Sequence, residues 1–160
     1  MIKLPIWPAF AAGVMAFSLL GWSGTVKAAE WANPDLLLSA KTLKQNIGKA
    51  DWAVVDCRDL KAYAKGHIPG AISLGKPCSK ALRDVTSRAF RDTSKYESLL
   101  GKVGIGNDTH VVFYYDGLGS ITSATVGFWI LEYLGHDKAH VLNGGLDAWR
   151  KAGNRLDAKP

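Results

Sequence analysis

The chain has 160 residues, a length typical of one globular domain. Hydrophobic residues make up 48% and charged residues 21% of the sequence, which excludes a collagen-like or a wholly disordered protein. The net charge is +6, and the two cysteines are too few for a disulfide scaffold or a four-cysteine zinc site. We therefore expect one domain with a buried core, without a cofactor or a metal.

The N-terminal region has the three parts of a secretory signal peptide. Lys3 precedes an apolar run over residues 6–20, and the small side chains of Val26 and Ala28 stand at the minus-three and minus-one positions of a cleavage site. We predict a signal peptide over residues 1–28, which places the mature protein in the periplasm or outside the cell.

Cleavage at this point leaves a domain over residues 29–160, and the loss of Lys3 and Lys27 lowers the net charge from +6 to +4. The alternative is an uncleaved membrane anchor, because residues 4–22 approach the roughly 20 residues that span a bilayer. Contact with a membrane is expected only in that case.

Basic side chains are concentrated between Lys76 and Lys95. An exported protein rarely meets nucleic acid, and Phe90 is the only aromatic residue in this stretch. We therefore interpret the stretch as a solvated loop and expect no nucleic-acid partner.

The periodicity of the apolar residues alternates between that of strands and that of helices. Strands are predicted at residues 53–57, 71–74, 111–115 and 139–142. One helix is predicted from a Ser39 cap through residue 47, and a second over residues 60–65 after an Asp59 cap. A third begins at a capping box of Ser94 and Glu97, and two more cover residues 122–134 and 146–152. Residues 75–93 are predicted to be irregular. Valine-rich strands separated by helices indicate an α/β fold with a central parallel sheet and helices on both faces.

Ligands of such sheets bind beyond the carboxyl ends of the strands. The clearest strand is followed by a glycine-containing loop and then a helix, so backbone N–H groups and the positive helix end can converge on a small anion. The same pattern is also ordinary in α/β folds, and both interpretations stay open at this point. The loop residues are Tyr115, Asp116, Gly117, Leu118, Gly119, Ser120, Ile121 and Thr122.

Two motifs resemble the opening and closing signatures of the rhodanese (sulfurtransferase) homology domain. The first comprises VVDCR at residues 54–58 and AKGHIPGAI at residues 64–72, and the second comprises VLNGGLDAW at residues 141–149 followed by AG at residues 152–153. The resemblance covers residues 35–156 and implies a single rhodanese-like domain.

A narrower resemblance concerns GIGNDTHVV at residues 104–112 and YLGH at residues 133–136. These segments are similar to the first half of tandem thiosulfate sulfurtransferases. The resemblance therefore implies the half of such proteins that is not catalytic.

Sulfur transfer in this family uses a cysteine directly after the central strand. Its thiolate accepts sulfane sulfur from a donor such as thiosulfate and carries it as a persulfide. Here the position is Tyr115 or, if the strand is counted one residue longer, Asp116, and no cysteine follows Cys78. The family's non-catalytic halves have aspartate in this place, which favours Asp116. A carboxylate there repels thiosulfate, and no arginine or lysine lies between residues 115 and 130 to offset the repulsion.

The resemblance and the missing cysteine together predict an exported, non-catalytic binding or regulatory module in sulfur metabolism. Its partner would be an unknown protein or a small anion, bound at the loop over residues 115–122. The alternative is a thiosulfate sulfurtransferase that uses an unusual cysteine or a separately encoded catalytic half.

The two cysteines allow three interpretations. Cys57 stands where the family has an apolar strand residue, so we expect a buried structural thiol, whereas Cys78 lies in a polar segment and is expected to be more exposed. A Cys57–Cys78 disulfide is compatible with export, but the sequence contains no information on the distance between them. A redox or persulfide-carrying role of Cys78 is the third interpretation.

Four further residues are expected to be structural. The family pattern implies an ion pair between Asp56 and Arg58 that holds the following loop. His67 is expected to be a hydrogen-bonded turn residue, not a metal ligand. Trp149 is expected to pack in the core at the last helix.

Overall fold

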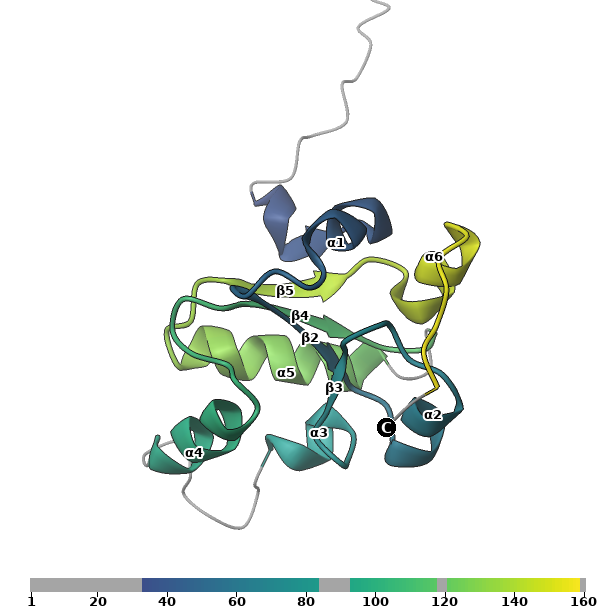
Figure 1. The fold of residues 1–160 in the computed structure, drawn as a ribbon. Coiled ribbons are helices and arrows are strands. Elements are labelled where there is room, and N and C mark those ends of the chain that lie inside the picture. The colour runs from purple at the N-terminus through teal and green to yellow at the C-terminus, as the bar shows by residue number, and fades with distance from the viewer. Residues whose placement is uncertain (1–32, 84–92, 118–120, 159–160) are drawn as a thin grey trace, which may run out of the picture. The chain divides into compact units, whose positions relative to one another are not determined.

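The computed structural model describes residues 33–83, 93–117 and 121–158. Five strands form one sheet in the order β1-β5-β4-β2-β3, and every neighbouring pair is parallel (Figure 1). The predicted parallel sheet is confirmed. The strands are β1 (Leu37–Leu38), β2 (Trp52–Asp56), β3 (Ile72–Ser73), β4 (His110–Tyr114) and β5 (Ala139–Leu142).

Helices connect the strands, and two of them begin at the predicted caps. Ser39 Oγ accepts the backbone N–H of Thr42, and the Asp59 carboxylate accepts that of Ala62. Within the described ranges, no helix is long and apolar enough to cross a membrane. The helices are the 3₁₀ turn η1 (Pro34–Leu36), α1 (Ala40–Asn46), α2 (Leu60–Lys65), α3 (Cys78–Ala81), α4 (Ser94–Lys102), α5 (Ile121–Tyr133) and α6 (Gly145–Lys151).

Apolar side chains pack on both faces of the sheet. Val55 and Phe113 lie in one cluster with residues of α3, α4 and α5, whereas Val54 and Val112 lie in a second cluster with residues of α1 and α6. Figure 1 shows α5 on one side of the sheet and α1 and α6 on the other. Successive strand residues point to opposite faces, so consecutive valines serve both layers. The prediction of helices on both faces is confirmed.

Three predictions on local structure need correction. Residues 34–38, for which no element was predicted, form η1 and the edge strand β1, and the stretch predicted to be irregular contains α3. Ser94 is the first residue of α4 and not its cap, because the chain enters the helix one residue earlier, where Thr93 Oγ1 donates to Glu97 Oε1 at 2.9 Å.

Trp52, His110 and His140 form a stack at the sheet. The Trp52 ring lies 4.5 Å from that of His110 and 5.8 Å from that of His140. His140 Nδ1 lies 2.7 Å from the Asp35 carbonyl oxygen, which only accepts, so Nδ1 carries the proton. His140 Nε2 lies 3.0 Å from His110 Nδ1, and in neutral His140 it is the acceptor of this pair. These contacts fasten η1 to β5.

We predict that the free energy of unfolding decreases as the pH is lowered from 7.5 to 5. Burial lowers the pKa of His140 below its usual value. The hydrogen bond to the Asp35 carbonyl raises this pKa, and the nearby His110 lowers it further. Unfolded histidine titrates near pH 6.5, so below about that pH the unfolded chain binds more protons than the folded one. Urea unfolding at both pH values should show a smaller free energy of unfolding at pH 5.

His140→Asn keeps an N–H donor for the Asp35 carbonyl but does not titrate, so it should reduce this pH dependence. His67→Asn is the matched control, because His67 contacts a different carbonyl, that of Tyr63, and lies outside the His140 cluster. An equal pH dependence in both variants would contradict the assignment to His140.

Candidate functional site

The carboxyl ends of β2, β4 and β5 meet at one edge of the sheet. The Cys57 peptide N–H, just after β2, donates to the Tyr114 carbonyl at the end of β4 over 3.0 Å. The Leu146 N–H, just after the β5–α6 turn, donates to the Tyr115 carbonyl over 2.7 Å. A Cβ atom on Gly145 would lie 2.4 Å from that carbonyl oxygen, so this turn needs glycine to approach so closely. The three segments form the candidate site.

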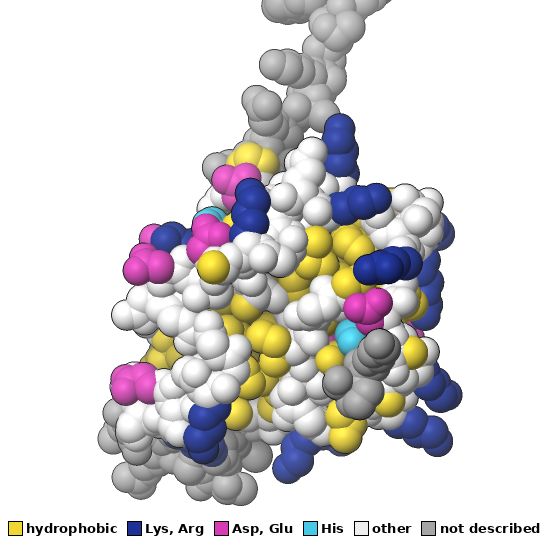
Figure 2. All heavy atoms as spheres, in the orientation of Figure 1, with side chains coloured by type: hydrophobic (Ala, Val, Ile, Leu, Met, Phe, Trp, Pro, Cys, Tyr) yellow, Lys and Arg dark blue, Asp and Glu magenta, His cyan; other side chains and the backbone are white. Residues whose placement is uncertain are grey.

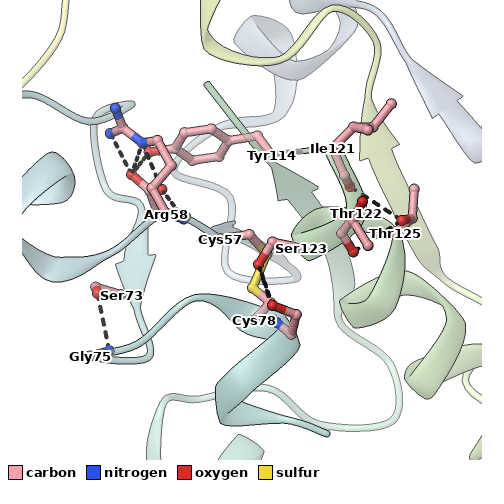
Figure 3. Close-up of a disulfide and its surroundings, with 12 residues drawn as sticks. Cys57, Arg58, Ser73, Gly75, Cys78, Tyr114, Ile121, Thr122, Ser123 and Thr125 are labelled. Atoms are coloured by element: carbon pink, nitrogen blue, oxygen red, sulfur yellow. Dashed lines mark hydrogen bonds and ion pairs between the residues drawn. A yellow bond between two sulfur atoms is a disulfide. The ribbon is translucent and has the colours of Figure 1, made fainter. Parts of the chain in front are cut away.

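A buried ion pair holds the centre of this edge (Figure 3). Arg58 Nε donates to Asp56 Oδ1 at 2.9 Å, and Nη2 donates to Asp56 Oδ2 at 2.7 Å and to the Gly66 carbonyl at 2.6 Å. The Tyr114 hydroxyl donates to the same carboxylate. Asp56 and Arg58 are almost fully buried. The ion pair implied by the family pattern is present, and it holds the turn at Gly66.

The charges of this pair shift the pKa values of their neighbours. Burial alone would lower the pKa of Arg58, but the hydrogen bonds and charge of Asp56 outweigh it and raise the pKa. Burial, with the Asp56 charge next, raises the pKa of Tyr114 far above its usual range. The Tyr114 hydroxyl is therefore neutral and donates a hydrogen bond to Asp56.

The two positions considered for the family's nucleophile differ in their surroundings. Tyr115 is buried in the apolar cluster under α5. Asp116 is 52% exposed, and its Oδ1 lies 3.7 Å from Arg58 Nη1 and 3.6 Å from Arg150 Nη1. Of the two side chains, that of Asp116 therefore faces the open part of the site.

The expectation that no cation offsets the Asp116 charge is wrong. Arg58 and Arg150 are distant from Asp116 in the sequence, one before it and one after it. A search for cations within residues 115–130 could therefore not find them. Figure 2 shows Lys and Arg side chains gathered along the side that carries α2 and α6. There a pocket of about 350 Å³ is lined by Arg58, Asp59, Lys61, Ala62, Lys65, Gly66, Asp116 and Arg150.

The predicted binding loop is described only in part. Leu118, Gly119 and Ser120 lie outside the described residues, so the predicted convergence of N–H groups there stays a prediction. Ile121 and Thr122 form the beginning of α5.

Cys57 and Cys78 form a disulfide and are fully buried. The disulfide, one of the three interpretations left open by the sequence, is therefore present. Cys57 is buried as expected but is not a free thiol, and the expectation of a more exposed Cys78 was wrong. The physical reason is that α3 packs against α5 and brings the Cys78 Cα within 4.7 Å of the Cys57 Cα. The sequence indicated this bond only through the presence of two cysteines in a chain that is predicted to be exported.

His67 and Trp149 make structural contacts. The His67 N–H donates to the Asp157 carbonyl at 2.8 Å, and its ring stacks on that of Tyr63 with centroids 3.8 Å apart. Trp149 is buried, and its Nε1 donates to the Arg155 carbonyl at 2.8 Å. Both residues fasten the C-terminal segment to the domain.

Residues 39–152 match the family described as rhodanese-like domain. The chain belongs to the rhodanese-like domain family. It is 35% identical over 121 residues to a thiosulfate sulfurtransferase of Corynebacterium glutamicum, and the aligned segment covers 75% of this chain and 39% of that protein. It is 30% identical over 127 residues to the sulfur carrier protein TtuD of Thermus thermophilus, and the aligned segment covers 79% of this chain and 43% of that protein.

The fold agrees with this assignment. The crystal structure of SseA from Escherichia coli, from work on 3-mercaptopyruvate sulfotransferases, matches with a TM-score of 0.65 and 25% identity over 76% of this chain and 51% of that one. The chain spans less than half the length of the two curated relatives named above. The correspondence to the first half of a tandem protein stays a prediction.

We predict that Arg58 and Arg150 differ sharply in their contribution to stability. Arg58→Ala leaves the buried Asp56 carboxylate without its cation and should lower the free energy of unfolding by about 3–5 kcal/mol. Arg150→Ala is the matched control, because its guanidinium is half exposed and lies 3.6 Å or more from Asp116 and Asp147. Its removal should cost less than about 1 kcal/mol. Equal losses in urea unfolding would contradict the central role of the buried pair.

Proposed function

We propose that this protein is a non-catalytic rhodanese-like module in sulfur metabolism that binds a protein partner or a small anion at the loop after β4. We further propose that it is exported to the periplasm or secreted. The support for the first point comes from the state of its thiols and from the charges around Asp116.

The observation that carries the proposal is the disulfide. Sulfur transfer needs a thiolate, and the two cysteines of the sequence are joined to each other and buried. Neither follows β4, where Tyr115 packs in the core and Asp116 offers a carboxylate. With the disulfide intact, the protein therefore has no thiol that can accept sulfur.

The charge distribution supports binding of anionic groups. Lys61 and Lys65 are one turn apart on α2, and both line the pocket with Arg150. The Asp116 carboxylate already lies between the two arginine side chains. An incoming anion, or an acidic side chain of a partner, would therefore bind on the lysine side of the pocket.

The second candidate is a sulfurtransferase that needs a separate catalytic half. Its support is that a thiosulfate sulfurtransferase relative is much longer, and this chain covers 39% of it. A complementing domain would then supply the thiolate that this chain lacks.

A thiosulfate:cyanide assay on the purified protein tests the proposal. We expect no turnover and no mass increase of about 32 Da, one sulfur atom, after treatment with thiosulfate. Turnover that Cys57→Ser or Cys78→Ala abolishes would overturn the proposal and identify an unusual nucleophile. Export has its own readout, because a mature N-terminus at Ala29 supports it and an intact Met1 in the membrane fraction contradicts it.

Asp116→Cys serves as the positive control. The new thiol would lie between Arg58 and Arg150, which favour its thiolate form, so this variant should gain about 32 Da from thiosulfate. Tyr115→Cys is the matched variant with a buried thiol and should gain nothing. Failure of Asp116→Cys to react, in a folded protein, would show that more than the missing thiol prevents sulfur transfer.

A further inference from the structure

We propose that the oxidation state of the Cys57–Cys78 pair sets the position of both ends of the loop after β4, and that the pair is a redox-sensitive device for the candidate site. The contacts that carry this proposal are independent of the ligand and of the catalytic state of the protein.

Cys57 is connected to the start of the loop. Its peptide N–H donates to the carbonyl of Tyr114, the last residue of β4, at 3.0 Å. The next residue, Arg58, places its guanidinium 3.7 Å from the Asp116 carboxylate. A displacement of Cys57 is therefore transmitted to Tyr114 and Asp116 by two separate contacts.

Cys78 is connected to the end of the loop (Figure 3). It is the first residue of α3, and the next residue, Ser79, donates its backbone N–H to Ser123 Oγ at 3.1 Å. The two hydroxyl oxygens of Ser79 and Ser123 lie 3.3 Å apart. Ser123 belongs to the first turn of α5 and is buried. The disulfide thus joins the segment before the loop to the segment after it.

The short helix α3 depends on this covalent bond. It has four residues, and Pro77 before it makes no side-chain cap hydrogen bond. Helices of this length are unstable without tertiary contacts. Leu82, the residue after α3, is buried in the core, and its carbonyl accepts the Tyr96 hydroxyl at 3.1 Å. Loss of the disulfide therefore leaves the N-terminal end of α3 held by Ser123 and by packing.

Reduction changes the space that the two sulfurs need. A dithiol reductant supplies two electrons and two protons, the S–S bond becomes two thiols, and the reductant becomes a disulfide. Because the bond is buried, this exchange requires a local opening of α3. Bonded sulfurs are about 2 Å apart, whereas non-bonded atoms need about 3.5 Å or more. In a close-packed core, the added separation must displace α3 or the end of β2.

Hydrogen exchange of the full chain, oxidised and after incubation with dithiothreitol, tests the proposal. Intact mass after alkylation reports how many thiols have formed. The Cys57 N–H, which donates to Tyr114, and the Ser79 N–H, which donates to Ser123, should exchange at least tenfold faster in the reduced protein, while β5 should be unchanged. Three outcomes would overturn the proposal: unchanged exchange of these two N–H groups with both thiols present, equal acceleration in β5, or a disulfide that the dithiol cannot reduce in the folded protein.

Two variants separate the connection at the end of the loop from a general loosening. Ser123→Ala removes the acceptor for the Ser79 N–H, so this N–H should exchange quickly in both redox states, while the Cys57 N–H still responds to reduction. Thr125→Val is the matched control, because the Thr125 hydroxyl donates to carbonyls of its own helix, those of Ile121 and Thr122, and the variant should behave as wild type. A tenfold redox response of the Ser79 N–H in Ser123→Ala would overturn this part.

Cys57→Ala combined with Cys78→Ala should reproduce the exchange pattern of the reduced protein without a reductant. If this double variant does not fold, the comparison of oxidised and reduced wild type decides alone. A folded double variant whose N–H groups at positions 57 and 79 exchange like those of the oxidised protein would overturn the proposal.

Discussion

The buried ion pair of Asp56 and Arg58 is the interaction on which the arrangement of this domain depends. Removing two charges from water is costly, and the cost is offset only when each charge has close partners. Here the carboxylate accepts hydrogen bonds from the Arg58 side chain, the Arg58 backbone and the Tyr114 hydroxyl. One carboxylate therefore joins the ends of β2 and β4, and its arginine extends the connection to Gly66 and to Asp116.

The same edge of the sheet explains how a family scaffold can have a different chemistry. A parallel sheet gathers the ends of its strands, so residues that are distant in sequence surround one position. In this chain Asp116 occupies that position, close to Arg58 and Arg150. The two cysteines form a disulfide between the end of β2 and α3. The fold is that of the family, while residues 115–122 of this chain contain no cysteine.

Sequence reasoning located the parts of the fold that repeat a strong local pattern. Valine-rich strands buried on both faces, and helices that begin at Ser39 and Asp59, have signals within a few residues of one another. The edge strand β1 and the helix α3 are too short for periodicity and exist because of tertiary contacts. Arg150 beside Asp116, and Cys78 beside Cys57, depend on distances that only the folded chain defines. The ion pair was found through family resemblance, since Asp56 and Arg58 alone form no distinctive pattern.

The two edges of the sheet have a consequence for how this domain meets other chains. β1 and β3 have two residues each, so each side of the sheet offers few backbone groups that a foreign strand could pair with. Long exposed edges are the usual starting points for strand exchange and for aggregation, and here they are nearly absent from the described sheet. Within the described residues, the sheet therefore offers an added strand few backbone hydrogen bonds at either of its outer strands.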